Sequence, residues 1–559
     1  MADSMNGAQA LIKTLVKAGV TTCFTNPGTS EMHFVAALDT EPHMRGVLTL
    51  FEGVATGAAD GYARMAEKPA ATLLHLGCGI GNGLANLHNA RKGKVPMINI
   101  VGDHATYHVQ YDAQLQSDIE TVARNVSPRF VRTSQTTEAL CQDATEAIYQ
   151  ARQLPNQVST LILPADVSWN EGGVVADVPE LPAAEAASDS TIEEIADVIR
   201  QASKRGKKTA LLLGGRALRE PSLLAAARIA EAHGVKLLAE TFPARIERGA
   251  GLPAVERIAY FTELVDVQLA DIKNLILVDS KAPVSFFAYP GKKSYLVPDK
   301  CQLFTLSTDE QDAEKSLNKL VAALAVENSQ PLLQPAHRPE QPSGELTAEK
   351  ACQAVGHFLP DNAIIVDESI TSGLMLNTMT EGAPRHDMLT LTGGAIGQGL
   401  PNAVGAAIAC PERPVLALVG DGSSMYTNQA LWTMARENTN VTSIIFNNSS
   451  YSVLNIELER VGAESTGEKA RSQLDLTGPV LNFAQLAQGM GVQGVRVSSA
   501  EELNSALADA FQHDGPNLIE VMIPESVSGT KRKVLPWVLK SLPIMPLPIT
   551  RALKKKLAP

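Results

Sequence analysis

The sequence has few aromatic residues, few cysteines and no long hydrophobic run. Aromatic residues make up 4% of its 559 residues, and its six cysteines are spread thinly, without a CxxC pair or a histidine at zinc-ligand spacing. This pattern indicates neither a disulfide framework nor a structural metal, so we expect reduced thiols in the core. No stretch reaches the roughly 18 apolar residues that span a bilayer, and the N-terminus lacks the pattern of a secretory signal. We therefore expect a cytoplasmic protein.

Positive charge is also scarce. Lysine and arginine number 48 against 60 aspartates and glutamates, which gives a formal net charge of −12. Nucleic-acid backbone is held by clustered positive charge, so we expect no nucleic-acid partner. Basic residues gather at the C-terminus, where residues 526–559 contain eight of them and no acid. Four prolines interrupt any long amphipathic helix there (Pro536, Pro543, Pro546 and Pro548). We expect this tail to cover the acidic body or a functional site rather than to contact a membrane.

Two polar, proline-containing stretches divide the chain, at residues 177–191 and 327–350. The segments around them alternate short Val/Ile/Leu runs with helix-length stretches, which is typical of parallel sheets covered by helices. We predict an α/β fold of three consecutive doubly wound parallel-sheet domains at residues 1–176, 190–327 and 345–528, followed by a basic tail at 529–559. Near-continuous apolar runs predict buried strands at 97–101, 209–213, 275–278, 363–366, 415–419 and 442–446.

The strongest motif is GDG at residues 420–422, directly after the apolar run VLALV. The next apolar run, SIIF, ends in two asparagines, so Asp421 and Asn448 both follow predicted strands. Ligands bind at the carboxyl ends of strands in an open α/β sheet, and Mg²⁺ prefers oxygen ligands that it shares with substrate phosphates. We therefore predict a magnesium site formed by the side chains of Asp421 and Asn448 and the main-chain carbonyl of Ser450.

The residues after Asp421 are small and open a predicted helix. The N–H groups of Gly422, Ser423 and Ser424 can therefore face a diphosphate at the helix N-terminus. GDGSS, then 22 residues, then NNSSYSVL resembles the thiamine-diphosphate (ThDP) motif of the family that contains acetolactate synthase, pyruvate oxidase, benzoylformate decarboxylase and pyruvate decarboxylase. The resemblance implies ThDP and Mg²⁺ as cofactors, with Tyr451 among the cofactor-binding residues. It implies that the first domain binds the aminopyrimidine, the third binds the diphosphate and a Rossmann-like central domain joins them.

The first domain contains three further candidate residues. FEGVATGAADGYAR resembles the family segment whose glutamate contacts the pyrimidine ring, which implies that Glu52 is catalytic. The alternative is a surface glutamate that caps the following helix. NPGTSE and LLHLGCGIGN resemble the benzoylformate decarboxylase loops in which a hydroxyl residue and a histidine face the substrate, here Thr29 and His75. A histidine can move protons near neutral pH, although a histidine bonded inside the fold is the alternative.

Two more segments of the third domain resemble cofactor-binding stretches. LTGGAIGQG implies that Ile396 supports the bent cofactor and that the Gly394 backbone bonds the pyrimidine, although any tight turn also explains these glycines. DESITSG resembles a stretch that helps to hold the diphosphate, with Ile370, Thr371 and Ser372 as donors, and the alternative is an ST-turn. In the central domain, LLLGGRALRE is similar to the nucleotide-binding turn of flavin-containing members, which leaves FAD open beside simple helix packing.

The alignment of these segments along the chain, and the chain length, are closest to those of the acetolactate synthase-like group. DAQLQSDI resembles its segment DAFQEADI, with Gln114 and Leu115 in place of Phe and Gln, while Glu457 stands where acetolactate synthases usually have a tryptophan. The resemblance implies an enzyme that decarboxylates a 2-keto acid and ligates the enamine to a second carbonyl compound. The alternatives are a non-ligating decarboxylase of benzoylformate decarboxylase type and a non-catalytic relative. It also implies a homodimer or homotetramer with active sites at subunit interfaces.

Overall fold

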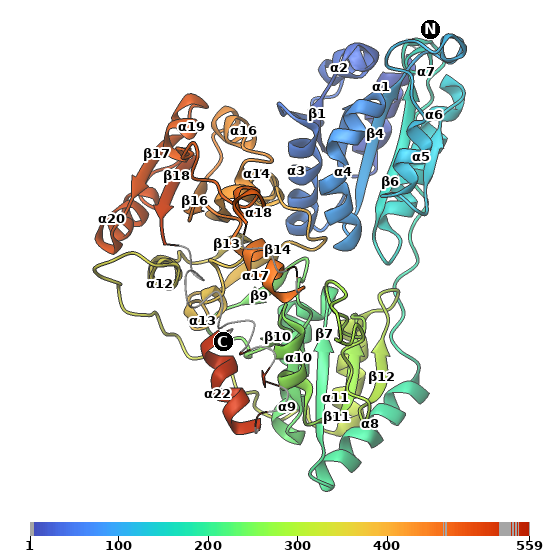
Figure 1. The fold of residues 1–559 in the computed structure, drawn as a ribbon. Coiled ribbons are helices and arrows are strands. Elements are labelled where there is room, and N and C mark those ends of the chain that lie inside the picture. Colours follow the sequence, from blue (N-terminus) through green and yellow to red (C-terminus); the bar gives the residue numbers. More distant parts are fainter. Residues whose placement is uncertain are drawn as a thin grey trace.

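The chain folds into three α/β units that follow one another along the sequence (Figure 1). The computed structural model describes residues 5–461, 463, 467–524, 538, 541, 542, 545 and 547–557. Each unit is built on a mainly parallel sheet, which confirms the predicted fold class. All six strands predicted from apolar runs are present, because each run supplies the buried side chains that a doubly covered sheet needs.

The first unit is a six-stranded parallel sheet in the order β2-β1-β3-β4-β6-β5. Its strands are β1 Thr22–Asn26, β2 Arg45–Leu48, β3 Ala70–His75, β4 Met97–Asp103, β5 Val131–Thr133 and β6 Val158–Pro164. Its helices are α1 Gly7–Lys17, α2 Met32–Ala37, α3 Glu52–Ala66, α4 Leu76–Lys92, α5 Ile119–Arg124, α6 Thr137–Arg152 and α7 Ala165–Trp169, with a 3₁₀ turn at Thr29–Glu31. The α1 and α6 side chains pack on one face of the sheet and those of α3 and α4 on the other.

The second unit is a five-stranded sheet in the order β10-β8-β7-β11-β12. Its strands are β7 Lys208–Leu213, β8 Lys236–Ala239, β10 Glu256–Arg257, β11 Ile272–Val278 and β12 Gln302–Ser307. Its helices are α8 Asp189–Lys204, α9 Glu220–His233, α10 Thr262–Leu269 and α11 Ala313–Leu324. The N-terminal side chains of α8 and α11, Ser188 and Asp312, accept hydrogen bonds from the first helical turn and so fix where these helices begin.

The third unit is a seven-stranded sheet in the order β17-β18-β16-β15-β13-β14-β9. Its parallel strands are β13 Ala363–Glu368, β14 His386–Thr390, β15 Val415–Gly420, β16 Val441–Asn447, β17 Gln493–Val497 and β18 Asn517–Met522. Its helices are α12 Ala348–Phe358, α13 Leu376–Met379, α14 Gly399–Ala409, α15 Asp421–Ser424, α16 Ala430–Glu437, α17 Ser452–Arg460, α18 Glu468–Ser472, α19 Phe483–Gly489 and α20 Ala500–Ala510. The edge strand β9, Ile246–Arg248, comes from the second unit and pairs antiparallel with β14.

Helices α3 and α14 join the first unit to the third. Their facing residues belong to one buried cluster that continues into both units. The helices approach so closely that a Cβ on Gly405 would lie 1.8 Å from the carbonyl oxygen of Ala58, and one on Gly61 would lie 2.1 Å from that of Asn402. Glycine is therefore required on both sides of this contact. The close packing fixes the first unit against α14, the helix that follows the turn at residues 392–398.

The C-terminal helix α22, Leu547–Leu557, packs on the second unit (Figure 1). Leu553 and the buried Leu542 contact the α10 cluster, and Arg551 forms a 2.6 Å ion pair with Asp271. Most of the predicted tail, including residues 529–537, lies outside the described residues. Within the described part, no helix is both long and apolar enough to cross a bilayer. The expectation of buried cysteines is wrong for Cys78, which is exposed in α4.

Candidate active site

Asp421 and Asn448 lie together at the carboxyl edge of the third sheet, after β15 and β16. The N–H of Asn448 donates to Asp421 Oδ2 at 3.1 Å, and the N–H of Gly422 donates to Oδ1 at 2.7 Å. Asn448 Oδ1 accepts from the N–H of Ser450 at 3.0 Å. Asp421 is only 5% exposed, and burial raises the pKa of its carboxyl above the ordinary value. A buried carboxylate beside an amide oxygen fits a hard cation, which would offset the cost of burying the charge.

Asp421 and Asn448 do not belong to a described cluster of acids. Within the described part of the chain, no group of three or more His, Cys, Asp or Glu side chains is placed to hold a metal ion. A cation at Asp421 would therefore take its remaining ligands from amide and main-chain oxygens, from water and from a phosphate group, as Mg²⁺ commonly does.

The segment after Asp421 is a short helix that packs against Tyr451. Gly422, Ser423 and Ser424 form the short helix α15, and Ser424 Oγ donates to the Asp421 carbonyl at 3.1 Å. The Tyr451 ring lies directly against Gly422, where a Cβ would come within 2.3 Å of it. A side chain at position 422 would therefore displace Tyr451.

A cavity of about 1240 Å³ opens at this edge. Its wall contains most of the residues predicted for the third domain: Ile370, Thr371, Ser372, Gly394, Ile396, Asp421, Gly422, Ser423, Asn448, Ser450 and Tyr451. Ser424 is not part of the wall and is buried behind it. Ile370 adopts a left-handed φ of 52°, which is strained for a β-branched residue and typical of functional sites.

The turn that carries Gly394 and Ile396 is held by buried groups that the sequence analysis missed. Glu368, at the end of β13, accepts hydrogen bonds from the N–H groups of Gly397 and Gly399, each at 2.6 Å. Burial raises the pKa of Glu368 to about 7. Gly394 has a φ of +75°, and a Cβ there would lie 2.4 Å from the Phe286 ring, so both backbone and space require glycine.

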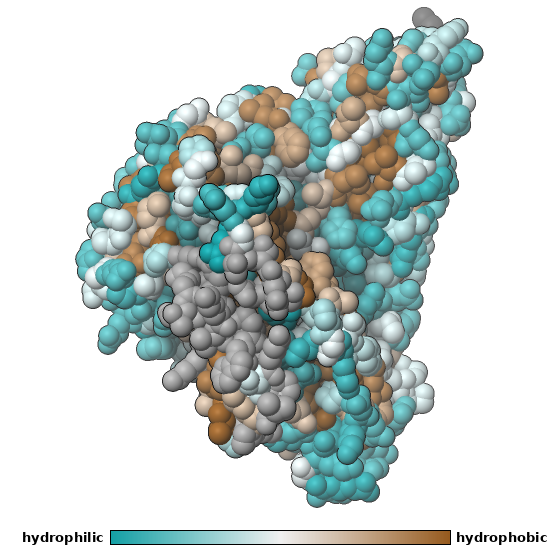
Figure 2. Space-filling view, in the orientation of Figure 1, coloured by the Kyte–Doolittle hydropathy of each residue, from teal (hydrophilic) through white to brown (hydrophobic). Residues whose placement is uncertain are grey.

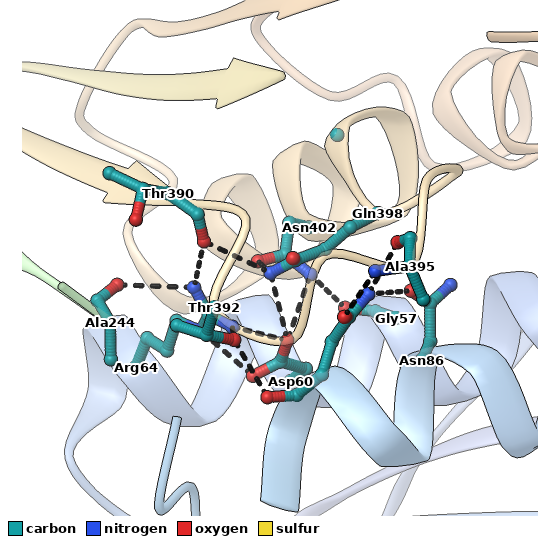
Figure 3. Close-up of polar contacts among 12 residues, drawn as sticks. Gly57, Asp60, Arg64, Asn86, Ala244, Thr390, Thr392, Ala395, Gln398 and Asn402 are labelled. Carbon is teal, nitrogen blue, oxygen red and sulfur yellow. Dashed lines mark hydrogen bonds and ion pairs between the residues drawn. The ribbon is translucent and has the colours of Figure 1, made fainter. Parts of the chain in front are cut away.

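Helices of the first unit also fix this turn (Figure 3). Asp60 and Arg64 form a fully buried two-point ion pair on α3, at 2.7 and 2.8 Å. Arg64 Nη1 donates to the Thr390 carbonyl at 2.8 Å, and Gln398 Nε2 donates to Asp60 Oδ2 at 3.1 Å. Asn89 of α4 donates to the Ala395 carbonyl at 2.8 Å. In the sequence, the only indication of this network was the spacing of Asp60 and Arg64, an acid and a base four positions apart in FEGVATGAADGYAR.

Thr29, Glu52 and His75 share the carboxyl edge of the first sheet, after the neighbouring strands β1, β2 and β3. Glu52 is 8% exposed and accepts a 3.0 Å hydrogen bond from Asn82 Nδ2, so it is a buried residue and not a surface cap. Thr29 is exposed in the 3₁₀ turn after β1.

His75 has a buried acidic partner that the sequence analysis missed. Its Nδ1 lies 2.8 Å from Glu31 Oε2, and Glu31 Oε2 also accepts the N–H of Gly28 at 2.6 Å. The His75 side chain remains 23% exposed. Glu31 thus fixes one ring nitrogen while the ring still reaches the surface of the edge.

Within one chain, Thr29, Glu52 and His75 of the first unit do not line the cavity. All described residues of the cavity wall lie between positions 241 and 473, except Val538. Thr29, Glu52 and His75 therefore lie at one sheet edge, outside the cavity wall, while Asp421 and Asn448 line the cavity at another.

The cavity wall also contains aromatic side chains from the second unit. Phe242, Tyr260, Phe286 and Phe287 form a continuous set of ring contacts with centroids 5.0–6.5 Å apart. In a sequence poor in aromatic residues this concentration gives one side of the cavity an apolar surface. Glu457 lines the same cavity.

The central glycine turn does not fit FAD. The N–H of Gly215 donates to Glu240 Oε1 at 3.2 Å, and the N–H of Arg216 donates to Asp279 Oδ2 at 2.8 Å. A Cβ on Gly215 would meet the Asp279 carboxylate at 2.3 Å. The N–H donors that would hold a diphosphate are thus already engaged by two carboxyl groups.

Comparison with known proteins agrees with this geometry. The family model described as thiamine pyrophosphate enzyme, C-terminal TPP binding domain, matches residues 372–521, and the model of the N-terminal TPP binding domain matches residues 5–123. A Mycobacterium tuberculosis protein named "Putative acetolactate synthase large subunit IlvX" is 54% identical over 527 residues, which cover 94% of this chain and 100% of that protein. The chain belongs to the thiamine-diphosphate-dependent enzyme family, as the resemblance predicted.

Two other relatives are benzoylformate decarboxylases. The Pseudomonas aeruginosa benzoylformate decarboxylase is 29% identical over 545 residues, covering 92% of this chain and 98% of that protein. The structure of Rhodococcus jostii 4-hydroxybenzoylformate decarboxylase superimposes with a TM-score of 0.80 at 22% identity, covering 94% of this chain and 100% of that one. The protein is a ThDP-dependent enzyme similar to acetolactate synthases and to benzoylformate decarboxylases.

Proposed function

We propose that the protein is a ThDP- and Mg²⁺-dependent enzyme that decarboxylates a 2-keto acid and ligates the remaining fragment to a second carbonyl compound. The observation that carries the proposal is the contact of Asp421 with Asn448 in the wall of a cavity that Gly394 and Ile396 also line. The high identity to a protein named as an acetolactate synthase large subunit supports ligation over simple decarboxylation.

The residues of the third unit would hold the cofactor. Asp421, Asn448 and Ser450 would hold Mg²⁺, and the α15 N–H groups, with Thr371 and Ser372, would donate to the diphosphate. Ile396 would support the bent cofactor. Bound ThDP supplies a carbanion-stabilising centre, which is the chemistry that loss of carbon dioxide requires.

The residues of the first unit would move protons. Glu52 would exchange a proton with the aminopyrimidine ring, since its carboxyl is buried and held by Asn82. His75, oriented by Glu31, would carry a proton to or from the substrate, and Thr29 would bind the substrate through its hydroxyl.

A second copy of the chain would complete the site. Within one chain Glu52 is absent from the cavity wall, whose described members come from the second and third units and from Val538. Large apolar side chains are exposed at Tyr107, Val109, Tyr111 and Leu115 of the first unit, and Figure 2 shows apolar patches on a mostly hydrophilic surface. We therefore propose a homodimer, or a homotetramer built from it, in which one subunit's first unit covers the other's cavity.

A non-ligating decarboxylase is the second candidate. The His75–Glu31 pair favours it, because a positioned proton donor can protonate the decarboxylated fragment and so end the reaction without an acceptor. Mass spectrometry of products formed from pyruvate or benzoylformate with ThDP and Mg²⁺ distinguishes the two: a ligated hydroxyketo product supports the first proposal, and an aldehyde alone supports the second.

The proposal predicts the effect of Glu52→Gln. The amide cannot exchange the proton, so keto-acid consumption should fall by about 100-fold or more while ThDP affinity changes little. The matched control is Glu349→Gln, an exposed glutamate in the first turn of α12, which should keep full turnover. Undiminished turnover in Glu52→Gln would remove Glu52 from the mechanism, and no ThDP-dependent carbon dioxide release by the wild type would leave only the non-catalytic alternative.

A further inference from the structure

The cavity extends beyond the predicted cofactor residues into a lobe between the second and third units. Two arginines line this lobe, Arg248 at the end of β9 and Arg257 at the end of β10. Their backbones are fixed, because Arg248 pairs with His386 of β14 and Arg257 pairs with Ala239 of β8. The two side chains are therefore delivered to the lobe by separate sheets.

The charge of Arg257 disfavours the charged form of Arg248. Burial, and then the charge of Arg257, lower the pKa of Arg248 to about 10. Burial also lowers the pKa of Arg257. Asp367 and Glu381 act on Arg248 in the opposite direction, and Asp367 does so on Arg257, so carboxylates of the cavity wall offset the cost of the two positive charges only in part.

The hydrogen-bonding capacity of the pair is only partly used. Arg248 Nη2 donates to the Asn377 carbonyl at 2.7 Å, but among the described residues its Nε has no partner. Arg257 Nη1 also has no hydrogen-bond partner among the described residues, and its ion pair with Asp367 Oδ2 is 4.0 Å long. Asp367 instead accepts from the side chain and N–H of Ser369.

Arg385 shows how the hydrogen-bond donors of a structural arginine are used in this protein. Arg385 contacts both oxygens of Glu220 at 2.9 and 3.0 Å and donates to two carbonyls. Half-buried guanidinium groups that retain a buried, unused N–H donor are typical of carboxylate and phosphate sites.

We propose that Arg248 and Arg257 form a binding site for an oxyanion, a carboxylate or phosphate, in the lobe of the active-site cavity. The Asp367–Ser369 contact connects the pair to the 369–372 turn, whose Ser372 N–H donates to the Ser369 carbonyl at 3.0 Å. The anion therefore lies next to the segment expected to hold the diphosphate. It is either a distal anionic group of the keto-acid substrate, an assignment that rests on the proposed function, or a free ion that occupies the lobe during turnover.

The first test measures binding without turnover. The holoprotein with ThDP and Mg²⁺ is titrated with inorganic phosphate by calorimetry at constant ionic strength. We expect saturable binding that weakens at least about tenfold in Arg248→Gln and in Arg257→Gln, less in Arg248→Lys, and not at all in Arg132→Gln, whose arginine is exposed and paired with Asp143. The lysine variant keeps the test decisive if a glutamine variant does not fold.

The second test identifies the source of the anion. The ratio of kcat/KM for 2-ketoglutarate to that for pyruvate should fall at least about tenfold in Arg248→Gln if the anion belongs to the substrate. An unchanged ratio together with lost phosphate binding assigns the site to a free ion. The proposal is overturned if the wild type binds no phosphate and shows no preference for a distal carboxylate, or if both glutamine variants keep wild-type phosphate affinity and the wild-type ratio. Phosphate affinity can be measured even if the protein turns over no keto acid, so failure of the proposed function and failure of the anion site can be told apart.

Discussion

At the scale of single residues, the Glu31–His75 contact would orient the imidazole that we propose to move protons at the first sheet edge. The buried carboxylate fixes the imidazole ring through Nδ1, and the N–H of Gly28 fixes the carboxylate in turn. An imidazole held in one orientation transfers protons more efficiently than one that samples several.

Glu31→Gln should therefore lower kcat by about 10- to 100-fold while KM and ThDP affinity change less. The matched control is Glu41→Gln, since Glu41 contacts His43 with the same kind of carboxylate–imidazole contact, at 2.9 Å, on an exposed surface. Steady-state kinetics with one keto acid measures both variants. An unchanged kcat in Glu31→Gln would show that His75 needs no orienting partner.

Which site residues were predictable depends on how each is recognised. Asp421 and Asn448 follow strand-like runs, so the local sequence pattern is enough to place them at a sheet edge. Glu52 was predicted from the resemblance of its segment to the family. Their roles as ligands and acid remain predictions. Glu31 and Glu368 were missed because each acts through partners brought close only by neighbouring strands, and no local pattern marks such contacts.

At the scale of elements, Glu368 is a side-chain cap for the turn that leads into α14. Its pKa of about 7 lies above the ordinary 4.5, so folding favours the protonated form. The stabilisation that this proton gives is complete below pH 4.5 and is lost as pH rises to 7. Burial raises the pKa of Glu240 to about 7 as well, so the same sign applies to both groups.

Glu368→Gln should accordingly flatten the pH dependence of the free energy of unfolding between pH 4.5 and 7, by on the order of 1–3 kcal/mol, and leave the part due to Glu240. Denaturant unfolding at several pH values measures the slope, with Glu349→Gln as the exposed control. A slope that matches the wild type would contradict the protonated, buried state of Glu368.

The α3–α14 contact depends on the Asp60–Arg64 pair. Asp60→Asn leaves the buried Arg64 charge without its carboxylate and should destabilise the fold by about 3–5 kcal/mol. Asp189→Asn, which removes an exposed partner of Lys319, should cost less than about 1 kcal/mol. Thermal unfolding of the two variants compares them directly, and equal small effects would show that the network is not a support of this contact.

At the scale of the whole molecule, the three-unit organisation was visible in the sequence because linker composition and apolar strand runs are local signals. The pairing of β9 with β14 was not, since a three-residue strand from one unit completes the sheet of another. The contact of α22 with the second unit, which includes the Arg551–Asp271 ion pair, agrees with the expectation that the tail covers the acidic body. Its partners could not be placed from the sequence, because Asp271 and Arg551 lie 280 positions apart. The prolines argued against one long helix in the tail but were compatible with a short one, such as the 11-residue α22.

The central claim is that each active site combines Glu52 of one subunit with Asp421 of another. The direct measurement is complementation between Glu52→Gln and Asp421→Ala, co-expressed and compared with each variant alone. Each alone should be inactive, while random pairing gives mixed dimers with one intact site and about one quarter of wild-type turnover. If the mixture stays as inactive as the separate variants, although mixed dimers form, the two residues do not meet across a subunit interface and the account is wrong.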